Sequence, residues 1–187
     1  MGLIREGINE VIATTRNNAA PMGIICRGRD PHMVLFKGSH TAENVESEGW
    51  VVANFIFDPV MYVRCAFDDL PHEMFVVEEV GGLLMHRLSA AEAWTAYLAD
   101  VEKKTEETLI VRLTPLREEV IDPVLHPVNR GFNSIIDATV HATRYIRTKD
   151  PWLLQLIEHH ASLARKCGGA GEWEALDLLY RYIGKAA

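Results

Sequence analysis

The chain has 187 residues, of which 48 % are hydrophobic and 24 % charged, and its formal net charge is −7. These proportions are those of a globular protein, so they exclude a disordered or collagen-like chain. The length suits one domain, or one domain with a small appendage. The acidic balance excludes a general nucleic-acid binder, because such a protein presents a basic surface to phosphates.

The sequence shows neither a membrane span nor a secretory signal. The most apolar run, residues 50–63, is interrupted by Asn54 and by Asp58-Pro59 and is shorter than the ~20 residues that a spanning helix requires. The N-terminus lacks the basic start and apolar core of a signal peptide. The three cysteines are far apart and form no CxxC pair, which favours reduced thiols. We therefore expect a soluble cytoplasmic protein without a membrane partner.

Short apolar runs separated by Gly, Pro, Asn and Asp fill the chain up to about residue 122, which is typical of a β-rich domain. Asn17-Asn18 separates the first two runs and predicts a hairpin. Several runs are apolar on both faces, as expected where one face lines a barrel and the other meets a helix or a subunit. We expect strands at 8–16, 21–27, 33–37, 50–57 and 108–116, and two strand-like pieces within 75–88.

Two short helices are expected between these strands. Residues 41–48 form the first, which Gly49 stops as a C-terminal cap. Asp58 and Pro59 open the second, as the N-cap and the first helical residue.

A longer helix is predicted over residues 89–104. Ser89 and Glu92 have the spacing of a capping box. The residues that follow place an apolar stripe at helical spacing, namely Ala90, Trp94, Tyr97 and Val101.

The pattern changes after Pro123 to the period of amphipathic helices. Three such helices follow, separated by Asp150-Pro151 and by Gly168-Gly169. Helices of this size cannot bury their apolar stripes alone, so they must pack on one another and on the barrel or a partner chain. The sequence therefore predicts a β-barrel domain at 1–122 and a C-terminal three-helix subdomain at 123–187.

Residues 37–41, Lys-Gly-Ser-His-Thr, join a predicted strand to the start of a helix. The free N–H groups and the dipole at a helix N-terminus attract anions. Lys37 adds a positive charge, and Ser39 and Thr41 add hydroxyl donors. The alternative is that Ser39 or Thr41 only caps the helix, which is the commoner role of such residues. We expect His40 to be an exposed loop residue rather than an acid.

Motifs at family-specific spacing run from Asn18 to Asn54. Residues 18–24 match an Asn/Ala-x-Pro-Met-Gly strand start, and residues 30–36 match an Asp-Pro start of an apolar strand. A Thr-x-x-Asn helix, a glycine and an aliphatic strand ending in Asn follow, matched by Thr41, Asn44, Val45, Gly49, Val51, Val52 and Asn54. These motifs resemble the flavin-reductase-like branch of the FMN-binding split barrels. The resemblance implies a mainly β fold with added α, namely an FMN-binding split β-barrel.

The tail carries a second motif, Asn-Arg-Gly-x-Asn at 129–133, which continues to Val-His-Ala-Thr-Arg at 140–144. With this motif the whole chain resembles one uncharacterised family of that superfamily, found in archaea and in some bacteria of one-carbon metabolism. Its members join a split barrel to a C-terminal helical domain. The resemblance implies a homodimer that binds FMN near the subunit interface, and it assigns no reaction.

The flavin site implied by the resemblance has three parts. Pro21, Met22, Gly23 and Ile24 would present strand backbone to the isoalloxazine ring, with Gly23 permitting close approach. Lys37, Ser39 and Thr41 would hold the phosphate. Asn44 and Asn54 would brace the loop or reach the ribityl chain through side-chain hydrogen bonds.

Arg130 is a further candidate, because an arginine just before a helix start can clamp a phosphate or carboxylate bidentately. The alternative is that Asn129 and the flexible Gly131 make a turn while Arg130 pairs with a surface acid. No metal site is expected, because the eight histidines show no HExxH motif and no close clustering with carboxylates.

The resulting hypothesis is a dimeric FMN flavoprotein that acts as an oxidoreductase without a catalytic side chain. FMN would accept a hydride from a reduced nicotinamide or a deazaflavin, and the protein would supply binding and orientation. The distribution of the family suggests an acceptor in pterin-linked one-carbon metabolism. The alternative is a non-catalytic protein that binds FMN or a pterin.

Overall fold

A computed structural model describes residues 2–28 and 30–184 and divides into two compact units. The barrel unit comprises Met1–Ile56 and Leu70–Val124, and the helical unit comprises Phe57–Asp69 and Leu125–Ala187. The predicted domain boundary after residue 122 therefore needs one correction. The stretch Phe57–Asp69, which the sequence placed with the strands, packs with the C-terminal helices, because its apolar helix face contributes to their core.

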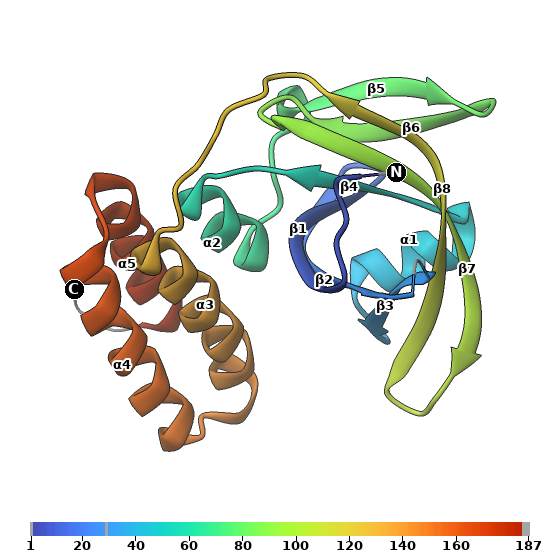
Figure 1. Cartoon of the computed structure of the whole chain (residues 1–187). Coiled ribbons are helices and arrows are strands. Elements are labelled where there is room, and N and C mark those ends of the chain that lie inside the picture. Colours follow the sequence, from blue (N-terminus) through green and yellow to red (C-terminus); the bar gives the residue numbers. More distant parts are fainter. Residues whose placement is uncertain (1, 29, 185–187) are drawn as a thin grey trace. The chain divides into compact units, whose positions relative to one another are not determined.

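Six antiparallel strands form the barrel in the order β1-β2-β3-β8-β7-β4 (Figure 1). Their bounds are β1 Gly7–Thr15, β2 Asn18–Arg27, β3 Asp30–Phe36, β4 Trp50–Phe55, β7 Ala93–Lys104 and β8 Thr108–Val120. Alternate residues point inward because successive side chains of a strand face opposite sides. The interior is filled by hydrophobic side chains from each of these strands, among them Val11, Ile24, Met33, Leu35, Val51, Tyr97 and Leu109.

The prediction of a helix at 89–104 is wrong, because most of this segment is strand β7. It pairs with β4 on one side and with β8 on the other. Tyr97, Ala99 and Val101 point into the barrel, whereas Trp94 and Ala96 pack in a second cluster. The spacing of these apolar residues also fits a helix. The segment forms a strand because it pairs with β4 and β8.

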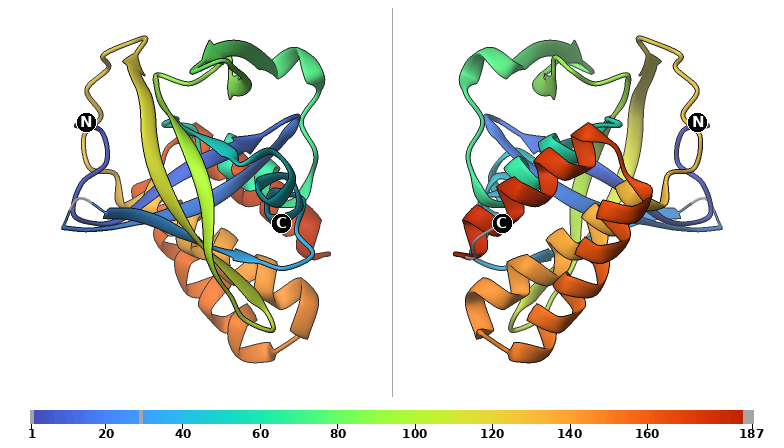
Figure 2. Two further views of the ribbon diagram at one scale, coloured as in Figure 1. Left: turned by 90° about the vertical axis from the view of Figure 1, so that its right-hand side faces the viewer. Right: turned by 90° about the vertical axis from the view of Figure 1, so that its left-hand side faces the viewer.

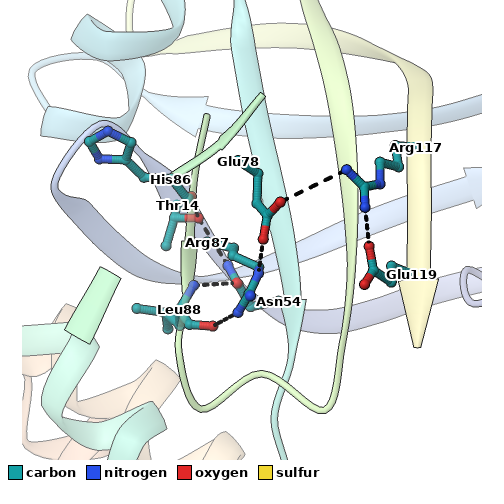
Figure 3. Close-up of polar contacts among 8 residues, drawn as sticks. All are labelled: Thr14, Asn54, Glu78, His86, Arg87, Leu88, Arg117 and Glu119. Atoms are coloured by element: carbon teal, nitrogen blue, oxygen red, sulfur yellow. Dashed lines mark hydrogen bonds and ion pairs between the residues drawn. The ribbon is translucent and has the colours of Figure 1, made fainter. Parts of the chain in front are cut away.

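A separate hairpin of β5 (Phe75–Val80) and β6 (Leu83–Leu88) covers that second cluster. A single-turn 3₁₀ helix, η1 (His72–Met74), precedes it. Figure 3 shows that Glu78 pairs with Arg87 within the hairpin at 2.9 Å, and that its contact with Arg117 of β8 at 3.8 Å attaches the hairpin to the barrel. The main-chain N–H of Leu88 donates to Asn54 Oδ1 at 2.7 Å. Val80 and Met85 are buried on the face toward the barrel.

The helical unit consists of α2 (Pro59–Phe67), α3 (Arg130–Thr148), α4 (Pro151–Cys167) and α5 (Ala170–Ile183), seen from two sides in Figure 2. Its core is built from small and aliphatic residues of all four helices, including Val63, Ile135, Ile157 and Leu179. No helix in the described part of the chain is long and apolar enough to cross a membrane.

Gly131 and Gly168 are in close contact where α3 meets the junction of α4 and α5. A Cβ atom on Gly131 would lie 2.5 Å from the Cα of Gly168. Gly131 has no positive φ, so the expectation that it supplies flexibility to a turn is corrected: its missing side chain allows two backbones to touch.

Candidate functional site

Strands β2 and β3 are paired over only a short part of their lengths. Only three residue pairs next to the connecting turn are in register, and the pair farthest from the turn is Ile25 opposite His32. From Asn18 to Ile24, β2 pairs with β1 on one side, while β3 continues beside β8. Within the described residues, β2 therefore has one edge without a strand partner over 18–24, which we call the open edge. Its main-chain groups are available to a ligand.

The short helix α1 (His40–Glu48) contacts β1, β2 and β3, and its N-terminus follows directly from β3. Gly38, with φ of +78°, allows the turn between them. Ser39 is the N-cap: its hydroxyl accepts a hydrogen bond from the N–H of Ala42 at 3.3 Å and donates to the carbonyl of Phe36 at 2.8 Å. The capping role is therefore real for Ser39, and it leaves the hydroxyl with one spare lone pair and no spare hydrogen.

Lys37 and Thr41 flank this cap and differ in exposure. Lys37 is exposed, and its ammonium forms no ion pair with any residue that the structure describes. Thr41 is only 2 % exposed, and its hydroxyl accepts a hydrogen bond from Asn18 Nδ2 at 2.9 Å. This contact fixes the start of α1 against the first residue of β2. The structure thus brings the predicted phosphate segment and the open edge together.

Asn44 and Asn54 hold the surrounding backbone in place. Asn44 Nδ2 donates to the carbonyl and hydroxyl oxygens of Thr15, both at 3.2 Å, and so connects α1 to the end of β1. Asn54 is fully buried, and its Nδ2 donates to the Ile12 carbonyl at 2.9 Å and the Thr14 hydroxyl at 3.0 Å. These are the contacts expected of bracing residues.

Pro21, Met22, Gly23 and Ile24 lie along the open edge. Met22 packs partly against the barrel core and Ile24 is buried in it. A Cβ atom on Gly23 would lie 2.9 Å from Cγ2 of Ile8. The sequence predicted that a flavin ring would approach Gly23 closely. On the face where a Cβ atom would stand, the Ile8 side chain of β1 occupies that space instead.

Arg130 lies apart from these residues in the chain, as the first residue of α3 in the helical unit. It is exposed and forms no ion pair with a described residue. Asn129, its N-cap, accepts hydrogen bonds from the N–H groups of Gly131 and Phe132 and donates to Glu172 at 2.9 Å. The alternative pairing of Arg130 with a surface acid is not seen in the part of the chain that the structure describes.

Two buried titratable groups have raised pKa values. Burial raises the pKa of Tyr97 in the barrel core to about 12, and burial raises that of the Cys65 thiol in the helical unit to about 12. Both groups therefore stay protonated at neutral pH, and neither is an activated nucleophile. No cluster of three metal-ligating side chains occurs among the described residues.

Sequence reasoning missed Asn18 and Thr15, which contact Thr41 and Asn44 from the β1–β2 hairpin. The sequence placed Thr15 near the end of a predicted strand and Asn18 in the turn and at the start of the next motif, and assigned neither to the site. The signal that distinguishes them is that Thr15 is fully buried, and burial of a polar residue is visible only once the strands are paired.

Family models of the DUF447 family, described as a protein of unknown function, match most of the chain. The model of the N-terminal domain matches residues 9–122, and a second DUF447 model matches residues 129–181. The chain belongs to the DUF447 family. The family suggested by the motifs at 18–54 and 129–144 is thereby confirmed.

An FMN-bound DUF447 protein from Methanosarcina mazei is 42 % identical to this chain, with a TM-score of 0.91 and 96 % of each chain covered. The predicted fold, a split barrel followed by three helices, is confirmed by this likeness. The 2-nitrobenzoate 2-nitroreductase of Pseudomonas fluorescens is 14 % identical over 64 % of this chain and 67 % of its own, with a TM-score of 0.51. That similarity shows a shared fold alone.

An uncharacterized protein of Methanocaldococcus jannaschii is 36 % identical over 66 residues. The match covers 33 % of the DUF447 chain described here and 34 % of the archaeal protein. The aligned part therefore spans about a third of this curated relative.

Proposed function

We propose that this DUF447 protein binds FMN and uses it as an oxidoreductase. The observation that carries the proposal is its likeness to the FMN-bound Methanosarcina mazei protein, which extends over 96 % of both chains at 42 % identity. The arrangement around α1 and the open edge supports it, because phosphate donors and free main-chain groups adjoin each other there.

The residues present fit a single phosphate. The N-terminus of α1 supplies main-chain N–H groups and the positive end of a helix dipole. Lys37 adds an exposed ammonium without an ion-pair partner among the described residues, and Thr41 adds a hydroxyl. These local donors bind an anion even though the chain carries a net charge of −7. Arg130 is proposed as a second anion-binding residue.

The open edge fits the polar rim of an isoalloxazine ring. Alternate residues of 21–24 direct their main-chain groups to this edge, because the others face the paired strand β1, and Pro21 has a carbonyl only. Asn44 and Asn54 keep the flanking backbone in place through their bonds to β1. Bound FMN would supply the redox chemistry, with a reduced nicotinamide or a deazaflavin as the proposed hydride donor. The chain itself then needs to bind, orient and exclude water, without an acid or base.

The purified protein provides a direct test. We expect a yellow protein whose flavin absorbance bleaches when NADH, NADPH or a reduced deazaflavin is added without oxygen; pterins are the first acceptors to try. A yellow protein that no reductant bleaches would favour the alternative, a non-catalytic flavin-binding protein. A colourless protein that cannot be reconstituted with FMN would contradict both.

A paired substitution tests the phosphate assignment. Lys37→Gln with Thr41→Val should weaken FMN binding by roughly a hundredfold or more, since each of the two hydrogen bonds to a charged group contributes about 1.5–3 kcal/mol. Lys103→Gln, an exposed lysine on β7, is the matched control and should bind FMN as the wild type does. Equal affinity in all three proteins would refute the assignment.

We further propose that the protein is a homodimer. Opposite the barrel interior, one wall carries apolar side chains that are exposed or partly exposed. We call Ile8, Ile25, Val34, Phe36 and Ile110 the outer face. They are neighbours by register, with Ile8 beside Ile25 and Val34 beside Ile110. A second copy that covers this face would remove it from water.

A further inference from the structure

Asn18 is the first residue of β2, and its side chain reaches the first turn of α1. Its Nδ2 donates a hydrogen bond to the hydroxyl of Thr41 at 2.9 Å. The bond links the open edge to the helix N-terminus where an anion is expected. Asn18 begins the strand motif at residues 18–24, but the proposed contacts with FMN do not include it.

This bond determines what the hydroxyl of Thr41 can do. A threonine hydroxyl has one hydrogen and two lone pairs, and an amide N–H can only donate. Thr41 Oγ1 is therefore the acceptor toward Asn18, and its own hydrogen must point to another atom. No residue in the described ranges accepts that hydrogen, although Thr41 is only 2 % exposed.

A buried donor without an acceptor is rare in folded proteins. It indicates that the acceptor comes from outside the chain. Thr41 is the second residue of α1, where the helix dipole favours negative charge. The exposed Lys37 lies four residues earlier in the chain and adds positive charge nearby. An anionic oxygen suits this position better than a neutral one.

We propose that Asn18 is a positioning residue, which holds the Thr41 hydroxyl as a donor toward a phosphate oxygen of the bound flavin. This assignment rests on the proposed FMN function. Asn18 makes no contact with the phosphate in this scheme. It acts by occupying a lone pair of Thr41, so that the hydroxyl hydrogen is available only to the ligand.

The test compares the affinities of the full-length protein for FMN and for riboflavin, which has the same ring and no phosphate. Asn18→Ala should lower the affinity for FMN about tenfold, the scale of one hydrogen bond to a charged group, and leave the affinity for riboflavin unchanged. Asn18→Asp should lower FMN affinity further, because a carboxylate accepts the Thr41 hydrogen and repels the phosphate. Asn17→Ala, the exposed turn neighbour, should change neither affinity.

A purely structural brace would give a different result. If Asn18 only fastens α1 to the barrel, Asn18→Ala lowers both affinities by the same factor, and the positioning role is overturned. Thr41→Val removes the hydroxyl while keeping the side-chain shape. In that background Asn18→Ala should leave the ratio of the FMN and riboflavin affinities unchanged; a further fall in this ratio would also overturn the proposal.

The wild-type protein separates this inference from the proposed function. If the wild type binds neither flavin, the proposed function fails and the role of Asn18 fails with it. If the wild type prefers FMN to riboflavin and Asn18→Ala keeps that preference, only the role of Asn18 is wrong.

Discussion

The side chain of Asn54 connects three strands through one buried amide. Its Nδ2 donates to the carbonyl of Ile12 in β1, and its Oδ1 accepts from the N–H of Leu88 in β6 at 2.7 Å. The same Nδ2 donates to Thr14, whose hydroxyl also donates to the carbonyl of His86 (Figure 3). Because the bonds that the amide makes are buried, the Ile12 carbonyl, the Thr14 hydroxyl and the Leu88 N–H each lose a partner if the amide is removed.

We expect Asn54→Ala to lower the free energy of unfolding by about 2–4 kcal/mol, since it leaves several buried donors and acceptors unpaired. Asn17→Ala, in an exposed turn, should change it by less than about 0.5 kcal/mol. Denaturant unfolding of the two variants and the wild type measures this difference. Equal midpoints would contradict a structural role for Asn54.

At the scale of elements, local chemistry predicted the short helices and failed on one strand. Asp58 caps α2 by accepting from Val60 and Met61, and Gly49 ends α1 with φ of +70°, both as the sequence indicated. These signals lie within a few residues of the helix ends. Strand β7 depends instead on pairing with β4 and β8, which no local pattern encodes.

In the candidate site too, local features were predictable from the sequence, and contacts between residues distant in the chain were not. Residues 37–41 were predictable because a strand end, a glycine and a capping serine follow one another in the chain. The contact between Asn18 and Thr41 joins residues 23 positions apart, and it depends on how β2 diverges from β3. The family resemblance suggested bracing by Asn44 and Asn54, whereas their partners on β1 are visible only in the structure.

Packing in the helical unit gives a matched pair of glycine substitutions. Gly131→Ala should destabilise the protein by roughly 3 kcal/mol or more, because its Cβ would lie 2.5 Å from backbone of Gly168. Gly171→Ala should be neutral or stabilise by about 0.5–1 kcal/mol, since its Cβ meets only Pro59 at 3.7 Å and alanine favours helix.

Thermal unfolding of both glycine variants provides the measurement. The expected order of melting temperatures is Gly171→Ala at or above the wild type and Gly131→Ala well below it. Equal melting temperatures for the two variants would contradict the prediction, because they would show that a Cβ atom at position 131 is tolerated beside Gly168.

For the whole molecule, the outer face predicts how the chain associates. Ile8 is 67 % exposed and Val34 is 40 % exposed, and a charge on either would be buried without a partner if a second copy covers them. Ile8→Glu with Val34→Glu should therefore convert the dimer to a monomer in sedimentation velocity. Val77→Glu, on the exposed side of β5 at 55 % exposure, should leave the mass unchanged. A wild-type monomer would contradict the proposal.

The inserted position of α2 in the chain has a consequence for synthesis on the ribosome. Helix α2 is translated before β5–β8, but the helices that bury Tyr62 and Val63 are translated after these strands. Until α3 emerges, these side chains have no core to enter, while the barrel strands on both sides can already pair. The nascent chain therefore carries an apolar segment that a chaperone can bind throughout barrel formation, and translation of the last helices removes it.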